Sequence, residues 1–282
     1  KGEYLGKGYV NPHSLIAVRV LTRGAEEIDK AFFKRRIESA LAYRRRFVKG
    51  ECYRAVYSEG DGLPGLIIDR YGDCVSAQIT TLGMEEWTDV IIELIEEIFN
   101  PSVIVLRNDS SVRSLEGLPL EKRIVKGSLE ALPVVKENGV SMEVDPMSGQ
   151  KTGMFLDQRE NRALFSSLAI EGETALDLFS YTGSWALALA SKGVSVTGVD
   201  SSDAAVTQAT RNAELNGLTD RCKFIKSDVF EFTKAELSRG AKYSIVVLDP
   251  PAFVKSKQKM KEGLRAYSEL NGLCMKLLKR GG

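Results

Sequence analysis

Four short apolar runs in the second half of the chain each lead into an acidic residue, and helical patterns separate them. The acids are Asp177, Asp200, Asp228 and Asp249. Strands that alternate with helices predict an α/β fold with a parallel sheet. Because ligands bind outside the carboxyl ends of such strands, we expect the four acids to line one crevice. For Asp228 alone, a helix N-cap is an equally good interpretation.

The last of these runs, residues 243–248, is followed by Asp249, Pro250 and Pro251. Proline removes backbone donors and fixes φ, so the pair predicts a stiff, extended ledge. Its carbonyls and the Asp249 carboxylate would face the crevice, where they could bind a planar, nitrogen-bearing substrate. A β-to-α loop with a simple proline turn is the alternative.

The loop after the first run, residues 178–183, favours a nucleoside ligand without a diphosphate. It carries Gly183 only, whereas a dinucleotide site needs G-x-G-x-x-G. Asp177 could pair with an ammonium group, and Gly183 would let the chain pass close to the ligand. Asp200 follows at the position from which nucleotide folds bind ribose hydroxyls. S-adenosylmethionine has the ammonium group and no phosphate.

These features resemble those of class I S-adenosylmethionine-dependent methyltransferases, with a Rossmann-like domain over about residues 144–282. The runs 150–159, 177–183 and 248–256 are more narrowly similar to the large-subunit (23S) ribosomal RNA cytosine-5 methyltransferases that carry an N-terminal PUA domain. The resemblance implies that Asp249 and Pro250 face a flipped base. It implies cofactor binding by Phe155, Gln158, Asp177, Tyr181, Gly183, Asp200 and Asp228.

Methylation of cytosine C5 normally requires a cysteine thiolate, which adds at C6 of the base. In the family that this chain resembles, the cysteine follows the next strand, which would begin near Gly282. The four cysteines present, Cys52, Cys74, Cys222 and Cys274, are expected to be ordinary buried thiols. Other RNA cytosine-5 methyltransferases place a cysteine beside the ledge, where this chain has Ala252 and Phe253.

We expect further sequence beyond Gly282 that includes the nucleophile, since the strand 243–248 would otherwise be an exposed edge. Methylation of a guanine nitrogen is an alternative that needs no thiol. A module that binds S-adenosylmethionine and RNA without turnover is another.

The first half of the chain predicts smaller elements. Residues 5–21 read as two strands around the Asn11-Pro12 turn and resemble the last hairpin of a PUA domain, with His13 as a turn residue. Residues 28–47 predict a helix whose apolar stripe, Phe33, Ile37, Leu41 and Phe47, packs between domains. Residues 51–142 predict an α+β insert with one helix over 84–99. The predicted domains are a PUA-like remnant (1–25), a linker helix (26–50), an α+β central domain (51–143) and a C-terminally truncated methyltransferase domain (144–282).

Basic residues suggest RNA contact: Arg44, Arg45, Lys151, Arg159 and Lys255. A solvated basic helix is the alternative for the first two. We also expect a mobile flap over residues 255–261. A net charge of +1 is weak for a nucleic-acid binder, so the prediction of a ribosomal RNA partner depends mainly on the resemblance.

The remaining expectations come from composition. The 282 residues are 43% hydrophobic and 27% charged, as in soluble multidomain chains. The sequence contains no run of about 20 apolar residues, no signal-peptide pattern and no C-x-x-C spacing. These features predict a cytoplasmic enzyme without a membrane segment or a metal, and we allow for a homodimer.

Overall fold

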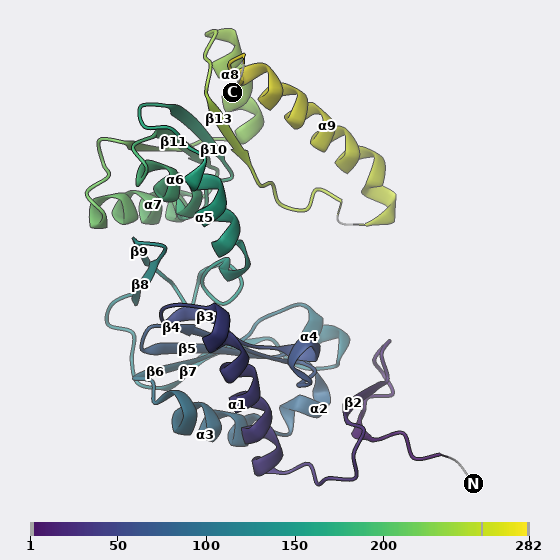
Figure 1. Cartoon of the computed structure of the whole chain (residues 1–282). Coiled ribbons are helices and arrows are strands. Elements are labelled where there is room, and N and C mark those ends of the chain that lie inside the picture. Colours follow the sequence, from purple (N-terminus) through teal and green to yellow (C-terminus); the bar gives the residue numbers. More distant parts are fainter. Residues whose placement is uncertain (1–2, 255, 281–282) are drawn as a thin grey trace. The chain divides into compact units, whose positions relative to one another are not determined.

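The computed structural model describes residues 3–254 and 256–280, which form two compact units. Unit 1 comprises Lys1–Lys136 and Glu143–Leu156, and unit 2 comprises Glu137–Met142 and Asp157–Gly282. Both units combine helices with strands, so the predicted α/β fold class is confirmed (Figure 1). The predicted domain boundaries stay a prediction.

Unit 1 is built on a five-stranded mixed sheet in the order β3-β4-β5-β6-β7. Its strands are β3 (Cys52–Tyr57), β4 (Leu66–Tyr71), β5 (Cys74–Ile79), β6 (Val103–Asn108) and β7 (Glu121–Lys126). Only β5 and β6 pair in parallel, and the crossover between them contains α2 (Leu82–Glu85) and α3 (Thr88–Phe99). The short elements η1 (Ser58–Asp61) and α4 (Val112–Leu115) occupy two of the other connections.

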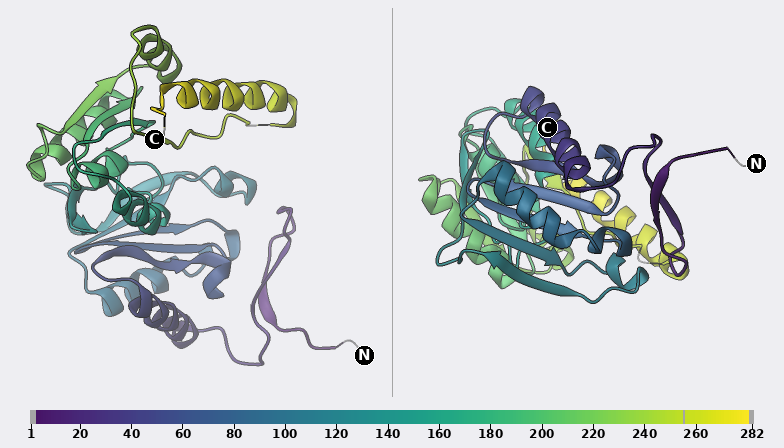
Figure 2. Two further views of the ribbon diagram at one scale, coloured as in Figure 1. Left: turned by 45° about the horizontal axis from the view of Figure 1, so that its top comes forward. Right: turned by 90° about the horizontal axis from the view of Figure 1, so that it is seen from below.

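Helix α1 (Lys30–Phe47) packs beside α3 on one face of this sheet (Figure 2). It begins at Asp29, whose side chain accepts a hydrogen bond of 2.8 Å from the Phe32 amide. The stripe of Phe33, Ile37 and Leu41 is buried in the core of unit 1, so the prediction that it packs between domains was wrong. Phe47 is 64% exposed, because it lies six residues after Leu41 and therefore off the helical repeat of about 3.6 residues.

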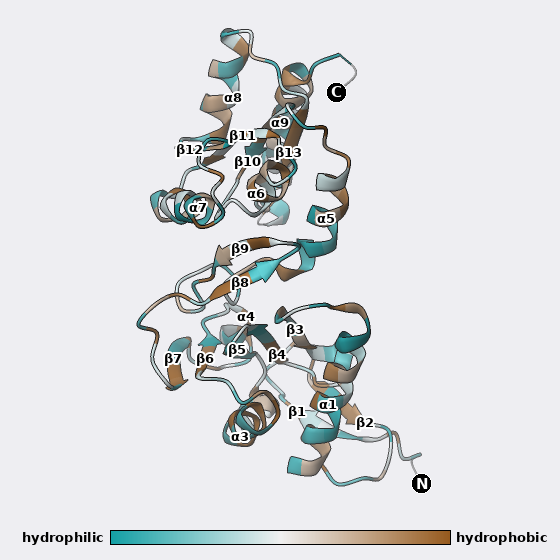
Figure 3. Ribbon diagram, turned by 60° about the vertical axis from the view of Figure 1, so that its left-hand side comes forward, coloured by the Kyte–Doolittle hydropathy of each residue, from teal (hydrophilic) through white to brown (hydrophobic). Residues whose placement is uncertain are grey.

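The predicted single helix over residues 84–99 is in fact two. Trp87 separates α2 from α3 with φ −103° and ψ 8°, and its ring packs 4.7 Å from that of Phe33. Helix α3 itself is amphipathic, with Ile91 and Leu94 buried. Figure 3 accordingly shows both hydrophobic and hydrophilic colours along α3.

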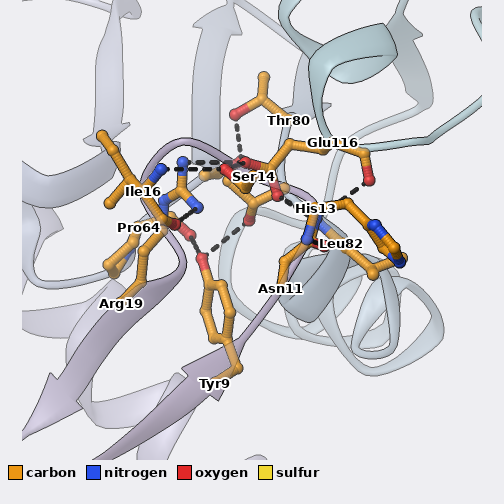
Figure 4. Close-up of polar contacts among 12 residues, drawn as sticks. Tyr9, Asn11, His13, Ser14, Ile16, Arg19, Pro64, Thr80, Leu82 and Glu116 are labelled. Carbon is orange, nitrogen blue, oxygen red and sulfur yellow. Dashed lines mark hydrogen bonds and ion pairs between the residues drawn. The ribbon is translucent and has the colours of Figure 1, made fainter.

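The hairpin of β1 (Lys7–Val10) and β2 (Val18–Thr22) is held to the rest of unit 1 by buried Glu116 (Figure 4). Its carboxylate accepts hydrogen bonds from Asn11 Nδ2 at 2.9 Å and Ser14 Oγ at 2.6 Å, and pairs with Arg19 at 3.0 Å. Burial alone would raise the pKa of Glu116, but the hydrogen bonds outweigh it and lower the pKa. The amide of His13 donates to Asn11 Oδ1 at 3.1 Å, which confirms His13 as a turn residue.

Unit 2 contains a fully parallel four-stranded sheet in the order β12-β11-β10-β13. Its strands are β10 (Thr174–Leu178), β11 (Ser195–Asp200), β12 (Cys222–Lys226) and β13 (Ile245–Leu248). Helices α5 (Arg159–Ser167), α6 (Ser184–Ala190) and α7 (Asp203–Leu215) lie on one face, and α8 (Val229–Ser238) and α9 (Met260–Leu277) on the other (Figure 1). The face toward α8 and α9 is apolar and includes Leu176, Leu178 and Val199.

At the β13 edge of the sheet, the residue that follows α9 pairs with the segment just before β13. Tyr243 and Leu278 form a parallel bridge, with the Tyr243 amide donating to Leu277 O and the Lys279 amide to Tyr243 O, both at 2.9 Å. Within the described part of the chain, β10 is otherwise the one strand that pairs with β13.

The remaining elements are the hairpin β8 (Val134–Glu137) and β9 (Val140–Glu143), and the short turns η2 (Leu156–Gln158) and η3 (Lys257–Lys259). Lys257 and Lys259 lie in η3 and Lys261 in α9, so most of the expected flap is helical, and Lys255 lies outside the described residues. Across residues 3–254 and 256–280, none of the helices has the length and hydropathy needed to cross a membrane.

Candidate active site

The loop that joins β10 to α6 has an unusual backbone. Phe179, Tyr181 and Gly183 all have positive φ, at 62°, 47° and 82°, and two of them are aromatic residues that rarely adopt it. The strand beside the loop holds this conformation, because the Ser180 amide donates to Val199 O at 3.0 Å. Strained backbone that its surroundings fix in this way is characteristic of ligand sites.

Asp177 lies just before this loop and points toward α6. Side chains alternate along a strand, so Leu176 and Leu178 face the apolar core on the opposite side of the sheet. The carboxylate of Asp177 is 1% exposed and accepts a hydrogen bond of 3.1 Å from the Ala186 amide. The sheet geometry thus places a buried acid at the start of the crevice.

Burial raises the pKa of Asp177 to about 7, and the nearby carboxylates of Asp200 and Asp249 act in the same direction. Asp200 and Asp249 are therefore both close enough to Asp177 to disfavour its negative charge. A ligand with a positive charge would relieve this repulsion.

Asp200 ends β11 and ties the strained loop to its neighbour strand. One oxygen accepts from the Tyr181 amide at 2.9 Å, and the other from the Ser202 amide at 2.9 Å. Each carboxylate oxygen has a second lone pair, so Asp200 can still accept from hydroxyl groups of a ligand.

Gly183 is required for packing, and its close approach to a ligand stays a prediction. A Cβ at Gly183 would lie 2.7 Å from Cζ of Phe224, a β12 side chain, and 3.2 Å from Cβ of Ala209. Gly198 faces the same ring, with 2.5 Å from a Cβ to Phe224 Cδ1. The two glycines therefore make room for Phe224.

Asp228 has an observed structural role. It is the N-cap of α8, and its Oδ1 accepts from the Glu231 amide at 3.0 Å. The side chain is exposed at the carboxyl end of β12, two residues after Lys226. Its Oδ2 is the oxygen that this cap leaves for a ligand.

The ledge after β13 is held by aromatic residues that sequence reasoning missed. The ring of Phe253 lies 4.8 Å from that of Tyr267 on α9 and 6.2 Å from that of Phe179 in the strained loop. Tyr267 also accepts a hydrogen bond of 3.2 Å from the Phe253 amide. Asp249 is exposed and Pro250 half-buried at this ledge.

A second missed feature is the buried ion pair of Arg162 and Glu137. The guanidinium makes two hydrogen bonds to the carboxylate, at 2.8 and 2.9 Å, and the two side chains are 2% and 3% exposed. The positive charge of Arg162 acts to lower the pKa of Asp177, against the larger effect of burial. Arg162 lies one helical turn beyond Arg159, just outside the motif that the sequence analysis used.

Gln158 and Asp249 line one groove of about 490 Å³, together with Trp185 and residues of α5 and β13. Most of its lining is apolar and follows the edge of β13. Of the residues predicted to bind the cofactor, Gln158 lines this groove, and Asp177, Tyr181, Gly183, Asp200 and Asp228 do not.

The other predicted residues are distributed over both units. Lys151 and Phe155 belong to unit 1, where the Lys151 ammonium lies 4.3 Å from the centre of the Phe155 ring. Arg159 belongs to unit 2. Arg44 makes a bidentate ion pair with Asp61 and therefore has a structural role in unit 1. Arg45 is exposed.

All four cysteines are free and buried, as expected. Burial raises the pKa of Cys74 and of Cys222 to about 12, and that of Cys274 to about 11. The Sγ of Cys52 lies 3.9 Å from the sulfur of Met154. The thiols of Cys74, Cys222 and Cys274 are therefore not poised to ionise. The described residues also hold no group of three or more His, Cys, Asp and Glu side chains suited to a metal ion.

The crevice suits S-adenosylmethionine in charge. It has a buried acid surrounded by further acids, for a ligand with ammonium and sulfonium groups, and no glycine-rich turn for a diphosphate. The hydroxyl of Ser180 is buried in the strained loop, and among the described residues it has no hydrogen-bond partner. Such a group is available to a ligand.

Comparison with known proteins agrees with this geometry. Residues 105–278 match the family model described as S-adenosylmethionine-dependent methyltransferase, and residues 1–23 match a PUA-like domain. The fold, the acidic crevice and this match define the class: an enzyme whose cofactor is S-adenosylmethionine.

Relatives narrow the class. The ribosomal RNA large subunit methyltransferase I of Shewanella amazonensis is 38% identical over 288 residues, which are 100% of this chain and 72% of the relative. The protein of the same name from Escherichia coli is 36% identical, covering 100% of this chain and 73% of its own length. The chain belongs to the family of these two methyltransferases.

A solved structure supports the fold alone. The crystal structure of SMU.776, complexed with SAH, has a TM-score of 0.82 at 23% identity, over 98% of this chain and 72% of that one.

Proposed function

We propose that this enzyme transfers a methyl group from S-adenosylmethionine to C5 of a cytosine in large-subunit ribosomal RNA. The names of its relatives support ribosomal RNA as the substrate. The observation that carries the proposal is the position of Asp249. This exposed acid begins a rigid diproline ledge, close enough to the buried Asp177 to influence its pKa.

At the cofactor, each acid has a separate task. Asp177 pairs with the ammonium group, Asp200 accepts from the ribose hydroxyls, and the free oxygen of Asp228 accepts from the adenine amino group. The Tyr181 amide fixes the strained loop through its hydrogen bond to Asp200, and Gly183 leaves room for Phe224. The sulfonium of S-adenosylmethionine supplies the methyl group.

At the substrate, Asp249 binds a base that is flipped out of its stack. Its carboxylate recognises the amino and ring-nitrogen edge of cytosine, and a proton held there makes C6 more electrophilic. Pro250 and Pro251 have no amide hydrogen and limited backbone freedom, so they keep the carboxylate in place. Methylation of cytosine at C5 also requires a cysteine thiolate, which adds at C6 of the base.

Methylation of a guanine nitrogen is the second candidate, and the state of the cysteines in the described part of the chain favours it. All four cysteines are buried, and the pKa values of Cys74, Cys222 and Cys274 are raised. A nitrogen nucleophile needs no thiolate.

The test is methyl transfer from labelled S-adenosylmethionine to ribosomal RNA, followed by digestion and nucleoside analysis by mass spectrometry. 5-Methylcytidine supports the proposal, and a methylated guanosine supports the second candidate. S-adenosylmethionine binding without any RNA product contradicts both and indicates a non-catalytic binding module. The Asp249→Asn variant is the control, since it should still bind the cofactor and form little product.

The roles of Phe155 and Gln158 in cofactor binding stay predictions, as do RNA contacts by Lys151, Arg159 and Lys255. A cytoplasmic location and a homodimer are also predictions, and measurement of mass in solution tests the latter.

A further inference from the structure

Three exposed aromatic side chains of unit 1 lie on α1 and at the end of β3, two elements that pack against each other. Tyr43, Phe47 and Tyr57 are 58%, 64% and 55% exposed. The rings of Tyr43 and Phe47 are in contact on α1, with centroids 5.0 Å apart. Single exposed apolar residues are normal on protein surfaces, but a group of large rings in contact is not. We call these three residues the aromatic patch.

The backbone of Tyr57 is joined to α1 through Asp61. The carboxylate of Asp61 accepts two hydrogen bonds from Arg44 on α1, and also accepts from the Tyr57 amide at 2.6 Å. Arg44 in addition donates to the Arg54 carbonyl at 3.2 Å. The patch therefore has a fixed framework that belongs to unit 1.

An arginine lies over each ring of the patch. The guanidinium carbons of Arg44, Arg46 and Arg54 lie 5.5, 5.8 and 5.3 Å from the centres of Tyr43, Phe47 and Tyr57 respectively. Stacked aromatic rings and guanidinium planes are the surfaces on which proteins stack unpaired nucleic-acid bases.

The charge around the patch is positive. Arg44 and Arg54 are neutralised by Asp61 and Asp69. Arg45 and Arg46 are exposed, and no carboxylate of the described residues lies within ion-pair distance of them. The acids that border the patch in sequence already have basic neighbours, since Glu51 lies 3.6 Å from Arg70 and Glu59 3.9 Å from Arg19.

We propose that the aromatic patch, with Arg45 and Arg46, binds a single-stranded segment of RNA by base stacking and phosphate contact. This proposal rests on the proposed function, because it assumes that RNA is the substrate. In this arrangement Arg44 holds the framework through Asp61, Arg45 and Arg46 contact phosphate, and the three rings stack on bases. A duplex would not fit, since its bases are not free to stack on the rings.

The test uses the full chain and a fluorescein-labelled single-stranded RNA of about 12 nucleotides, a length within the range that one binding domain covers. Fluorescence anisotropy measures affinity for this probe and for the corresponding duplex. We expect the Tyr43→Ala/Phe47→Ala variant to bind the single strand about tenfold or more weakly, with little change for the duplex. Tyr4→Ala is the matched control, because Tyr4 is an exposed aromatic (56%) outside the patch.

A second variant tests the charge without removing the rings. Arg45→Gln/Arg46→Gln should make the dependence of affinity on salt less steep by about one to two phosphate contacts. If both variants bind the single strand as the wild type does, the proposal is overturned, and a protein partner becomes the better explanation of the patch. Thermal unfolding confirms that each variant is folded.

The outcome for the proposed function is separate. Methyl transfer to ribosomal RNA by the wild type, with unchanged affinity in both variants, would reject the patch and leave the proposed function intact. Tight binding of the single strand through the patch, without methyl transfer, would support the patch and reject the proposed function.

Discussion

The backbone amide of Tyr181 donates a hydrogen bond of 2.9 Å to Oδ2 of Asp200, and so fixes the strained loop after β10 to the end of β11. This bond joins the two strand ends that carry the predicted cofactor acids. Asp200 therefore both shapes the site and remains available to a ligand.

Replacing Asp200 with Ala should lower the affinity for S-adenosylmethionine by about 10- to 100-fold, because both the loop and the acceptor for the ribose are lost. Isothermal titration calorimetry measures this. Asp203→Ala is the control, since Asp203 lies at the start of α7 and pairs with Lys226 at 3.2 Å. Equal losses in the two variants would show that Asp200 has no special role.

Asp177 makes stability depend on pH. Its pKa is about 7 in the folded chain against a usual 3.8, so between these values the folded state keeps a proton that the unfolded state has released. The contribution of Asp177 to stability therefore falls as pH rises from about 4 to about 7, and stays low above that range.

Asp177→Asn removes this dependence and still accepts from the Ala186 amide. We expect the variant to gain stability relative to the wild type as pH rises, by at most about 4 kcal/mol at pH 8, while it loses cofactor affinity. Urea unfolding at pH 4.5 and pH 8 measures the difference. A difference that is the same at both pH values would contradict the burial of an ionisable Asp177.

Part of this site could be predicted from the sequence, because strand periodicity and parallel topology bring the ends of successive strands to one edge. For that reason, Asp200 and Asp249 lie close enough to Asp177 to raise its pKa. Pairings between distant elements could not be predicted. Nothing in the pattern around Gly183 indicates that Phe224 lies against it, or that Arg44 would find Asp61, since both contacts depend on tertiary packing.

For the helices and strands too, some features could be predicted from the sequence and others could not. The positions of the parallel strands in unit 2 followed from short apolar runs, although β13 begins at Ile245, two residues after the predicted start at 243. The break at Trp87 did not, because its contact with Phe33 on another helix determines it.

Gly183→Ala should destabilise the protein by about 1 to 3 kcal/mol, since alanine is strained at φ 82° and its Cβ would lie 2.7 Å from Phe224. Thermal or urea unfolding measures the loss. In the Gly183→Ala/Phe224→Leu double variant, the steric part should be relieved and the backbone part should remain. If Phe224→Leu costs the same with and without Gly183→Ala, the two residues are not coupled and the packing argument is wrong.

The buried pair of Arg162 and Glu137 offers the last prediction. Removing one partner leaves an unpaired charge in the interior, so Arg162→Met and Glu137→Gln should each destabilise unit 2 by about 3 to 5 kcal/mol. The double variant Arg162→Met/Glu137→Gln should lose less stability than the sum of the two single losses, because no buried charge remains.

Arg162→Met should also raise the pH at which Asp177 ionises, since a positive charge that lowers its pKa is gone. NMR titration of the Asp177 carboxyl carbon measures that pH, and Arg239→Met, at an exposed ion pair of α8, is the control. If the two stability losses are additive and the Asp177 titration is unchanged, the pair neither couples in stability nor affects the charge of Asp177.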